Sequence, residues 1–476
     1  MANQSPIEHV IVLMLENHTF DKMLGFLKKG EGLTGKEFNL VDPLNPNSER
    51  VLVSDEAENV TSPDPMHTLR DTNIELFGPN ATVQTKDLNS GFLFDYIRRA
   101  GGNLETGKKI MQSYKPESLP VLSALAKEFC LCDHWFSSVP GPTFPNRFYA
   151  HAATSDGQAF NNKNHDYAMR TIYNNLQDHN QTWGIYFHDI AVALMLTRIK
   201  DKKANFKRFP DFLKDAKSGK LPNYSFLVPS FSDFQQRKAN DQHPPHDVRF
   251  GEILIADVYE AIRGNEALWK KSLLIVLYDE HGGSYDHVHT PPFAPFQKYK
   301  VRNPDGKDSV SPPFKFDRLG LRVPAILISP FVKKNSLDST IYEHASIPAT
   351  VKKLFDLADF LTERDRHANT FEGALSLKNP RDDAPRKLKR PGPAIEAELQ
   401  SKLARTEITE QEVMEGAALG EMSMRPLSDF QQDLIGIADS LDERPRMRAL
   451  AASHQFHSEH EAAVYIHERV TNFLGG

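Results

Sequence analysis

Four short, continuous apolar runs constrain the fold of this chain more than any other feature of its sequence. They cover residues 9–15, 224–228, 272–278 and 323–329. Unbroken runs of this length with β-branched residues are typical of strands buried on both faces, as in parallel sheets. Helical patterns lie between them, at 247–263 and 346–357. Strands that alternate with helices predict an α/β fold with a doubly wound sheet.

The alternation of strands and helices ends at about residue 377, which predicts a catalytic domain over residues 1–377. From residue 378 the chain is rich in proline and arginine, which predicts a linker. Residues 394–476 are charged and helix-rich, so 378–476 is predicted to be a helical C-terminal region of unknown role. Two long stretches, 41–80 and 290–313, interrupt the pattern, and loops this long are usually functional or partly disordered.

Composition and charge exclude several classes of protein. The 57 basic and 63 acidic residues give a net charge of −6, whereas nucleic-acid binders usually carry a basic stripe. No segment approaches the roughly 20 apolar residues of a spanning helix, and the first residues lack the features of a Sec signal peptide. We therefore expect a cytoplasmic protein or one exported by a signal-independent route. Cys130 and Cys132 are too close for an unstrained disulfide and are predicted to be core residues.

Acidic residues follow two of the predicted strands at the point where each strand ends. Glu16 and Asn17 follow the first run, and Asp279 and Glu280 follow the third. Open α/β sheets bind ligands beyond the carboxyl ends of their strands, and paired buried carboxylates need a cation. The oxygen donors predict one or more divalent metal ions, calcium, magnesium or manganese before zinc. Alternatively, Glu16 caps a helix near Thr19 and the acidic pair lies in a solvated turn.

Thr143 lies in a proline-rich segment, 140–147, that fixes the backbone around its hydroxyl group. Pro145 suits the first turn of a helix predicted over 146–153, which places Thr143 just before a helix N-terminus that favours an anion. A hydroxyl beside a divalent metal ion loses its proton more easily and becomes a nucleophile. The alternative is that Thr143 is a plain helix N-cap.

Three of the nineteen histidines lie in distinctive positions. His67 follows an Asp-Pro-Met segment, and His243 and His344 each come just before a predicted helix. Donors of this kind stabilise the charge of a phosphoryl transition state, and histidine is the usual general acid near neutral pH. Taken singly, each is more often a capping or packing residue. His246 and His287 are weaker candidates because each can simply buttress its neighbours.

Four segments occur in an order that resembles a known family. They are Glu-Asn-His-Thr-Phe-Asp at 16–21, Pro-Gly-Pro-Thr-Phe-Pro-Asn-Arg at 140–147, His-Pro-Pro-His-Asp at 243–247 and Tyr-Asp-Glu-His-Gly-Gly-Ser-Tyr-Asp-His-Val at 278–288. They resemble the bacterial phospholipase C and acid phosphatase family, which includes plant non-specific phospholipases C and belongs to the alkaline phosphatase superfamily. The resemblance covers about residues 6–365, and four ordered motifs make it specific.

The resemblance implies an alkaline-phosphatase-like three-layer sandwich with a mostly parallel central sheet and one metal ion. It also implies which residues surround that ion, namely Glu16, Asn17, Thr143, Asp279 and Glu280. Thr143 would be phosphorylated during turnover, and Asn17 would also bind substrate.

The resemblance assigns the histidines as well. His67 and His243 would contact the phosphate or assist the leaving group. His344 falls in a similar motif and is a third catalytic candidate, and His188 is a further candidate for substrate binding.

The sequence therefore predicts a phosphoric-ester hydrolase. The expected enzyme is a metal-dependent phospholipase C that hydrolyses phosphatidylcholine-type phosphodiesters to diacylglycerol and a phosphorylated head group. Thr143 as the nucleophile favours a phospholipid substrate, and Phe293 and Phe296 favour peripheral membrane contact. The alternatives are an acid phosphatase acting on phosphomonoesters, a binding protein without catalysis, and a toxin delivered to another cell.

Overall fold

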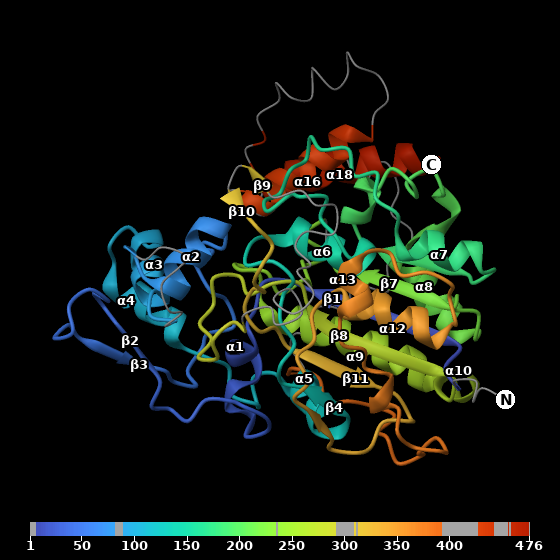
Figure 1. Ribbon diagram of the computed structural model, residues 1–476, viewed down its shortest axis with the longest axis horizontal. Helices are drawn as coiled ribbons and strands as arrows, with labels where there is room; N and C mark the ends of the chain where they lie inside the picture. The colour runs from blue at the N-terminus through green and yellow to red at the C-terminus, as the bar shows by residue number, and fades with distance from the viewer. Residues whose placement is uncertain are drawn as a thin grey trace.

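An eight-stranded sheet forms the centre of the computed structural model, which describes residues 6–80, 89–234, 237–291, 309–310, 313–392, 427–441, 456 and 458–475 (Figure 1). The strand order is β12-β4-β11-β8-β1-β7-β5-β6. The strands are β1 (His9–Leu15), β4 (Cys130–Cys132), β5 (Trp183–Phe187), β6 (Phe206–Arg208), β7 (Tyr224–Val228), β8 (Ser272–Tyr278), β11 (Ala325–Ile328) and β12 (Leu337–Asp338). The four predicted runs form β1, β7, β8 and β11.

Strand direction confirms the predicted, mostly parallel sheet. Strands β8, β1, β7, β5 and β6 pair in parallel, as do β4 and β12. Strand β11 runs antiparallel to both β8 and β4. Its apolar run suggested a parallel strand like the others, but burial on both faces does not depend on direction.

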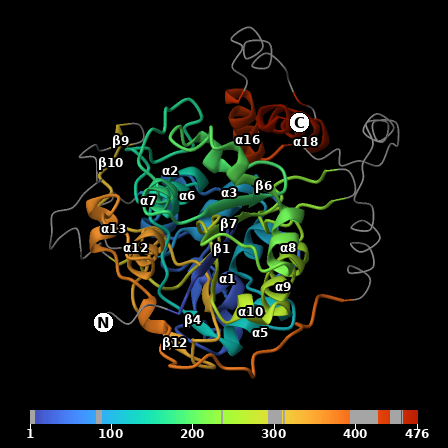
Figure 2. The same cartoon turned by 90° about the vertical axis from the view of Figure 1, so that its right-hand side faces the viewer.

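Helices cover both faces of the sheet, which gives the predicted three layers (Figure 2). One layer contains α5 (Pro120–Glu128), α8 (Phe209–Lys217), α9 (Val248–Gly264) and α10 (Glu266–Trp269). The other contains α6 (Thr143–Ala152), α7 (Ile172–Asp178), α12 (Ser346–Leu354) and α13 (Glu363–His367). The short helices η3 (Val192–Met195), η4 (Lys203–Asn205) and η5 (Glu372–Ala374) lie in the connections.

A small lobe occupies the chain between β1 and α5 and is drawn in blue in Figure 1. It contains α1 (Phe20–Leu24), η1 (Gly25–Leu27), the hairpin of β2 (Phe38–Leu40) and β3 (Arg50–Leu52), α2 (Leu69–Phe77), α3 (Phe92–Arg99), α4 (Leu104–Lys108) and η2 (Lys109–Met111). The lobe has its own apolar cluster, which includes Leu76, Phe92 and Tyr285. The stretch 41–80, expected as a loop, therefore contains β3 and α2.

The second long stretch, 290–313, lies mostly outside the described residues, and so do Phe293 and Phe296. At its end, β9 (Ser309–Val310) pairs with β10 (Pro313–Phe314) in a two-stranded sheet.

The described part of the C-terminal region packs on the rest of the chain. Residues 384–390 lie along α9, where Arg390 pairs with Asp257 and Glu260. Helices α16 (Asp429–Ser440) and α18 (Glu459–Leu474) contribute apolar side chains to the main hydrophobic core, among them Leu434 and Ile466. The two helices fit the predicted helical character, and they share one core with the sheet. The boundary at residue 378 stays a prediction.

Two further features of the sequence can be placed in the structure. None of the helices in the described ranges combines the length and apolar character needed to cross a bilayer. Cys130 and Cys132 are buried, free thiols within β4, as predicted.

Glu252 of α9 caps the start of α5 in place of a residue of α5 itself. Its fully buried carboxylate accepts the N–H groups of Val121 at 2.5 Å and Leu122 at 3.0 Å. Replacing Glu252 with alanine leaves both amides unpaired, so we expect the free energy of unfolding to fall by about 2 kcal/mol in urea titrations. The control is Glu266→Ala, whose side chain is 40% exposed and should cost under about 1 kcal/mol. Equal losses would contradict the capping role.

Candidate active site

The register of β1 and β8 brings the predicted carboxylates together at the carboxyl edge of the sheet. Leu15 pairs with Tyr278, so the next residues, Glu16 and Asp279, leave the sheet side by side. Asp279 Oδ1 accepts the N–H groups of Asn17 at 3.2 Å and Glu280 at 2.8 Å. Both acidic pairs are fully buried.

These positions exclude the two alternative interpretations of the carboxylates. The N-cap of α1 is Thr19, whose hydroxyl accepts the N–H of Lys22 at 3.1 Å, so Glu16 does not cap that helix. Because Asp279 and Glu280 have no exposed surface, they do not lie in a solvated turn.

Two residues at this edge, Asn17 and Gly282, have a positive φ, and their backbones approach each other closely. Asn17 has a φ of 58°, in the left-handed region that is costly for a non-glycine residue and often occurs at functional sites. Gly282 has a φ of +58°, and a Cβ atom there would lie 2.1 Å from the Asn17 carbonyl oxygen. Only glycine fits so close an approach, and its N–H donates to Glu280 Oε2 at 2.7 Å.

Thr143 is the first residue of α6, which begins three residues earlier than the sequence predicted. The Oδ1 atom of Asn161 accepts the Phe144 N–H at 2.8 Å, a contact from later in the chain that stabilises the early start. The N-cap is Pro142, so the Thr143 side chain does not cap the helix. Its hydroxyl donates instead to Glu16 Oε2 at 3.4 Å.

Arg147 is the site residue that sequence reasoning missed. It lies one helical turn after Thr143 on α6 and is buried. Its Nη2 donates to Glu16 Oε1 at 2.6 Å, and its Nε is 3.2 Å from Asp279 Oδ2. The i, i+4 spacing from Thr143 places both side chains on one helix face, which is the signal that could have found it.

Burial and mutual repulsion strongly perturb the acidic groups. Burial raises the pKa of Glu16 well above its usual value, although Arg147 acts in the opposite direction. Burial likewise raises the pKa of Asp279 to about 6. Burial also opposes ionisation of Glu280, yet His67 and His281 together hold its pKa below the usual value. One arginine therefore does not fully neutralise this edge.

Two buried oxygens show that a divalent metal ion fits this edge. Within the described part of the chain, Asn17 Oδ1 and Glu280 Oε1 have no hydrogen-bond partner. An unpaired buried oxygen is costly, and a hard cation bound by carboxylate, amide and hydroxyl oxygens removes that cost. The donor set of Glu16, Asn17, Thr143, Asp279 and Glu280 fits such an ion.

A second group of acidic and histidine side chains, Asp21, Asp286 and His287, brings its ligand atoms within 4.8 Å of one another. Arg322 already lies between its carboxylates, 2.9 Å from Asp21 and 3.0 Å from Asp286. His287 Nδ1 is 2.6 Å from Asp21 Oδ2, so this histidine buttresses its neighbours as expected. Arginine lies between carboxylates in both groups, so the unpaired oxygens of Asn17 and Glu280 are the observation that favours the Glu16 edge as the metal site.

His67 and His243 meet over the carboxylate edge. His67 Nδ1 donates to Pro65 O at 3.0 Å, and its Nε2 is 3.3 Å from Asn17 Nδ2 and 3.6 Å from Glu280 Oε1. His243 Nδ1 donates to Pro244 O at 2.5 Å. Its buried Nε2 has no hydrogen-bond partner among the described residues. The two rings lie edge to face, 5.9 Å apart.

The surroundings of these two rings move their pKa values in opposite directions. Burial lowers the pKa of His67, but the carboxylates of Glu280 and Asp64 outweigh it and leave the pKa raised. Burial lowers the pKa of His243 to about 4, although Asp241 acts against it.

His344 and His188 are placed differently from the other predicted residues. His344 Nε2 donates to Asp279 O at 2.5 Å and its Nδ1 accepts from Trp135 Nε1 at 3.3 Å, so both nitrogens are occupied and one of them holds Asp279. His188 Nδ1 donates to Val228 O at 3.2 Å, and its ring stacks on Phe209. His188 thus lies at the carboxyl ends of β5 and β7, but its ring contacts Val228 and Phe209 rather than the other predicted residues.

Asp241 and His246 support the His243 loop from behind. Asp241 Oδ1 accepts the His243 N–H at 3.2 Å and lies 2.7 Å from His246 Nδ1. The Asp241 carbonyl accepts the Glu16 N–H at 3.0 Å. His246 therefore buttresses its neighbours, as expected, and Asp241 joins the loop to the end of β1.

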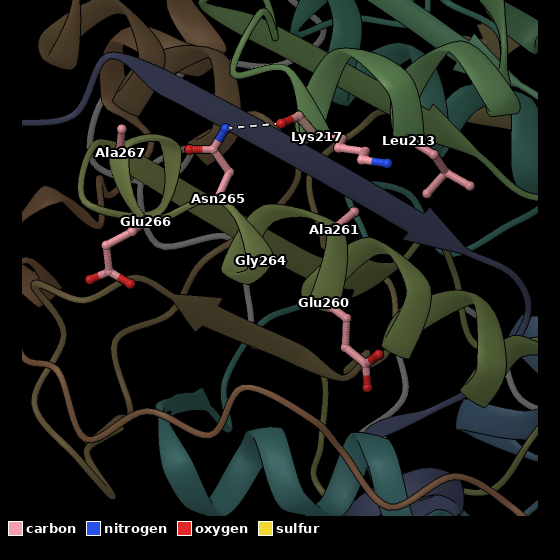
Figure 3. A pocket seen from close by; sticks show the side chains of 8 residues that line it. All are labelled: Leu213, Lys217, Glu260, Ala261, Gly264, Asn265, Glu266 and Ala267. Atoms are coloured by element: carbon pink, nitrogen blue, oxygen red, sulfur yellow. Dashed lines mark hydrogen bonds between the residues drawn. The ribbon is translucent and has the colours of Figure 1, made fainter.

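A hollow of about 640 Å³ lies between α8, α9 and α10 (Figure 3). These helices precede β7 and β8, so the hollow lies near the amino ends of those strands. Two of its acidic residues, Glu260 and Glu266, are paired with Arg390 and Arg386. The chemically active groups therefore lie at the opposite edge of the sheet.

Comparisons with known proteins show the family to which this chain belongs. The model of the phosphoesterase family matches residues 7–358. Non-specific phospholipase C6 from Arabidopsis thaliana is 39% identical over 453 residues, which is 90% of this chain and 84% of that protein. Phospholipase C B from Mycobacterium tuberculosis is 27% identical over 402 residues, 73% of each chain. A solved structure from Vibrio parahaemolyticus, described as a protein in the alkaline phosphatase superfamily, is 11% identical with a TM-score of 0.33, covering 53% of this chain and 64% of that one. That structural likeness is too weak to carry an argument.

Proposed function

This chain belongs to the phosphoesterase family and is a hydrolase of phosphoric esters, and on that premise we propose that it is a metal-dependent phospholipase C. It cleaves phosphatidylcholine-type phosphodiesters to diacylglycerol and a phosphorylated head group. The similarity to proteins named phospholipases C in a plant and a bacterium supports this choice. The observation that carries it is the Thr143 hydroxyl, buried at the start of α6 and 3.4 Å from Glu16 Oε2.

Thr143 is the nucleophile of the proposed reaction. Its oxygen attacks phosphorus, the bond from phosphorus to the alcohol oxygen breaks, and the alcohol leaves with a proton from a histidine. Water then hydrolyses the phospho-threonine. Thr143 suits this step because the first amide groups of a ten-residue helix lack partners within the helix and favour an anion.

Glu16, Asn17, Thr143, Asp279 and Glu280 are the residues that would hold the metal ion, which supplies positive charge and lowers the pKa of the Thr143 hydroxyl. Glu16 also accepts the hydroxyl proton and orients the oxygen. Arg147 opposes the rise in the pKa of Glu16 and Asp279 and holds both carboxyl groups in place.

The histidines have separate roles in this proposal. His67 and His243 face the phosphate, and between them they bind its oxygens and protonate the leaving alcohol. The free Nε2 of His243 and the Nε2 of His67 beside Glu280 support this assignment. His344 acts as a positioning residue, because its Nε2 holds the Asp279 carbonyl and its Nδ1 is bonded to Trp135.

A pair of assays tests the proposed substrate. After treatment with a chelator, the protein is supplied separately with calcium, magnesium, manganese or zinc. It is then assayed on phosphatidylcholine vesicles and on a simple phosphomonoester. We expect release of diacylglycerol and phosphocholine, with kcat/KM at least about tenfold above that for the monoester, a difference of roughly 1.4 kcal/mol in transition-state binding.

Two outcomes would contradict this proposal. Turnover of the monoester alone would identify an acid phosphatase with the same site. The absence of turnover with every metal would favour a binding protein.

A further inference from the structure

Two side chains from the C-terminal helices reach the segment that carries His243 and His246. Phe430 of α16 stacks on the His243 ring, with centroids 5.5 Å apart and planes 9° from parallel. Glu459, the first residue of α18, has its Oε1 atom 3.4 Å from His246 Nε2. Both side chains are buried, with Phe430 only 3% exposed. The region without a motif therefore contacts the active-site loop directly.

Phe430 also contacts the neighbours of two other site residues. Its ring lies edge-on to Phe144 at 6.3 Å and to Phe231 at 5.1 Å. Phe144 follows Thr143 in α6, and the Arg147 guanidinium lies 5.5 Å from the centroid of the Phe231 ring. The Phe430 ring thus packs against a neighbour of Thr143, against a neighbour of Arg147 and against the His243 ring itself.

A second residue of α16 acts on the start of α6. Asp433 Oδ2 accepts from Asn161 Nδ2 at 2.9 Å. The other side of the same amide, Asn161 Oδ1, accepts the Phe144 N–H at 2.8 Å. Asp433 therefore fixes the orientation of the amide that stabilises the first turn of α6.

Helix α18 supports the loop from its other side. Glu459 Oε1 accepts the Asp233 N–H at 2.8 Å and the Gln431 amide at 3.0 Å. It thereby meets the imidazole of His246, whose other nitrogen lies 2.7 Å from Asp241. Asp241 in turn accepts the backbone N–H of His243.

The His243 ring needs this support because its hydrogen bonds do little to fix the orientation of the ring. Its Nδ1 donates to Pro244 O in its own turn and lies 3.9 Å from Asp64 Oδ1, and its Nε2 has no hydrogen-bond partner among the described residues. The ring plane is therefore set by packing, with Phe430 on one face and the edge of His67 nearby. A catalytic group displaced by about 1 Å can lose about 100-fold in rate.

We propose that the C-terminal helices are part of the catalytic site and that Phe430 is a positioning residue that fixes the His243 ring for phosphoryl transfer. This inference rests on the proposed function. It assigns a role in catalysis to helices α16 and α18 of the C-terminal region, whose role the sequence left open.

A double-mutant cycle between Phe430 and His243 tests this proposal. Phe430→Leu keeps an apolar side chain but removes the stacked ring, and we expect kcat to fall about 10- to 100-fold with KM nearly unchanged. His243→Ala should fall further. The double variant should be no slower than His243→Ala, because Phe430 acts only through that ring.

Leu434→Ala is the matched control in the same helix. Leu434 is fully buried in the main core, so this variant should lower Tm at least as much as Phe430→Leu while it keeps kcat within about threefold. If Phe430→Leu fails to fold, Phe430→Met enters the same cycle.

Three results would overturn the proposal. The first is a wild-type kcat in Phe430→Leu, and the second is additive losses of kcat in the cycle. The third is a fall in kcat of Leu434→Ala as large as that of Phe430→Leu, which would show that kcat simply follows stability. The cycle is measured on whichever phosphoester the wild type hydrolyses, so it can fail while the proposed substrate stands. Thr143→Ala tests the nucleophile separately.

Discussion

Thr143→Ala is expected to lower kcat on phosphoesters by about 10⁴- to 10⁶-fold, because it removes the oxygen that attacks phosphorus. The fold should persist, since the lost contact is one 3.4 Å hydrogen bond to Glu16. Thr143→Val, which keeps the shape of the side chain, should be equally inactive. Turnover is measured by release of diacylglycerol or phosphate, with unfolding curves to show that the variants are native.

Thr143→Ser supplies the positive control for this experiment. Serine keeps the hydroxyl at the first position of α6 and should retain activity within about tenfold of wild type. Enzyme quenched with acid during turnover of phosphatidylcholine should carry phosphocholine on the peptide that contains Thr143. An alanine variant as active as wild type would remove Thr143 from the mechanism.

Arg147→Gln is expected to destabilise the metal-free protein by about 3–5 kcal/mol, the range for breaking a buried ion pair from one side. Arg147 is buried and contacts Glu16 and Asp279. Without the guanidinium, the two buried carboxyl groups lose the positive charge that opposes the rise in their pKa. A bound divalent cation compensates them, so the loss should shrink when metal is added. Urea titrations with chelator and with metal measure both values.

Arg364→Gln is the matched control for the arginine experiment. Arg364 is equally buried and donates to Glu343 at 2.6 Å. It should also destabilise the protein, but by the same amount with and without metal. If Arg147→Gln responds to metal no more than this control does, the carboxylate edge is not the metal site.

The central strands could be read from the sequence because each is a self-contained signal. Strand β8 is a largely apolar run buried from end to end, and β1 is apolar and buried from Val10 to Leu15. The two strands pair as neighbours in the sheet. Strands β4 and β12 have three and two residues, too few for a pattern. They exist because Leu337 pairs with Leu131 from 206 residues away. The antiparallel direction of β11 also depends on such long-range pairing, with β8 and β4.

The same distinction between local patterns and long-range contacts applies to the residues of the candidate active site. Glu16 and Asp279 could be predicted as candidates because burying a carboxylate directly after a buried strand costs free energy unless a cation or hydrogen bonds stabilise it. Arg147 was missed because the role of an arginine in a helix depends on what lies across the interior. The start of α6 was misplaced because Asn161, seventeen residues further on, holds its first turn. The stack of Phe430 on His243 joins residues with no local pattern in common.

The pairing of β1 with later strands has a consequence for the synthesis of this chain. Strand β1 leaves the ribosome first, but its two neighbours, β7 and β8, begin at residues 224 and 272. Until then, a wholly apolar strand has both edges open, which is the arrangement most prone to aggregate. The nucleophile and the carboxylates come together only after residue 280 has been made. The nascent chain therefore exposes an apolar strand during most of its synthesis, and its candidate active site is complete only late.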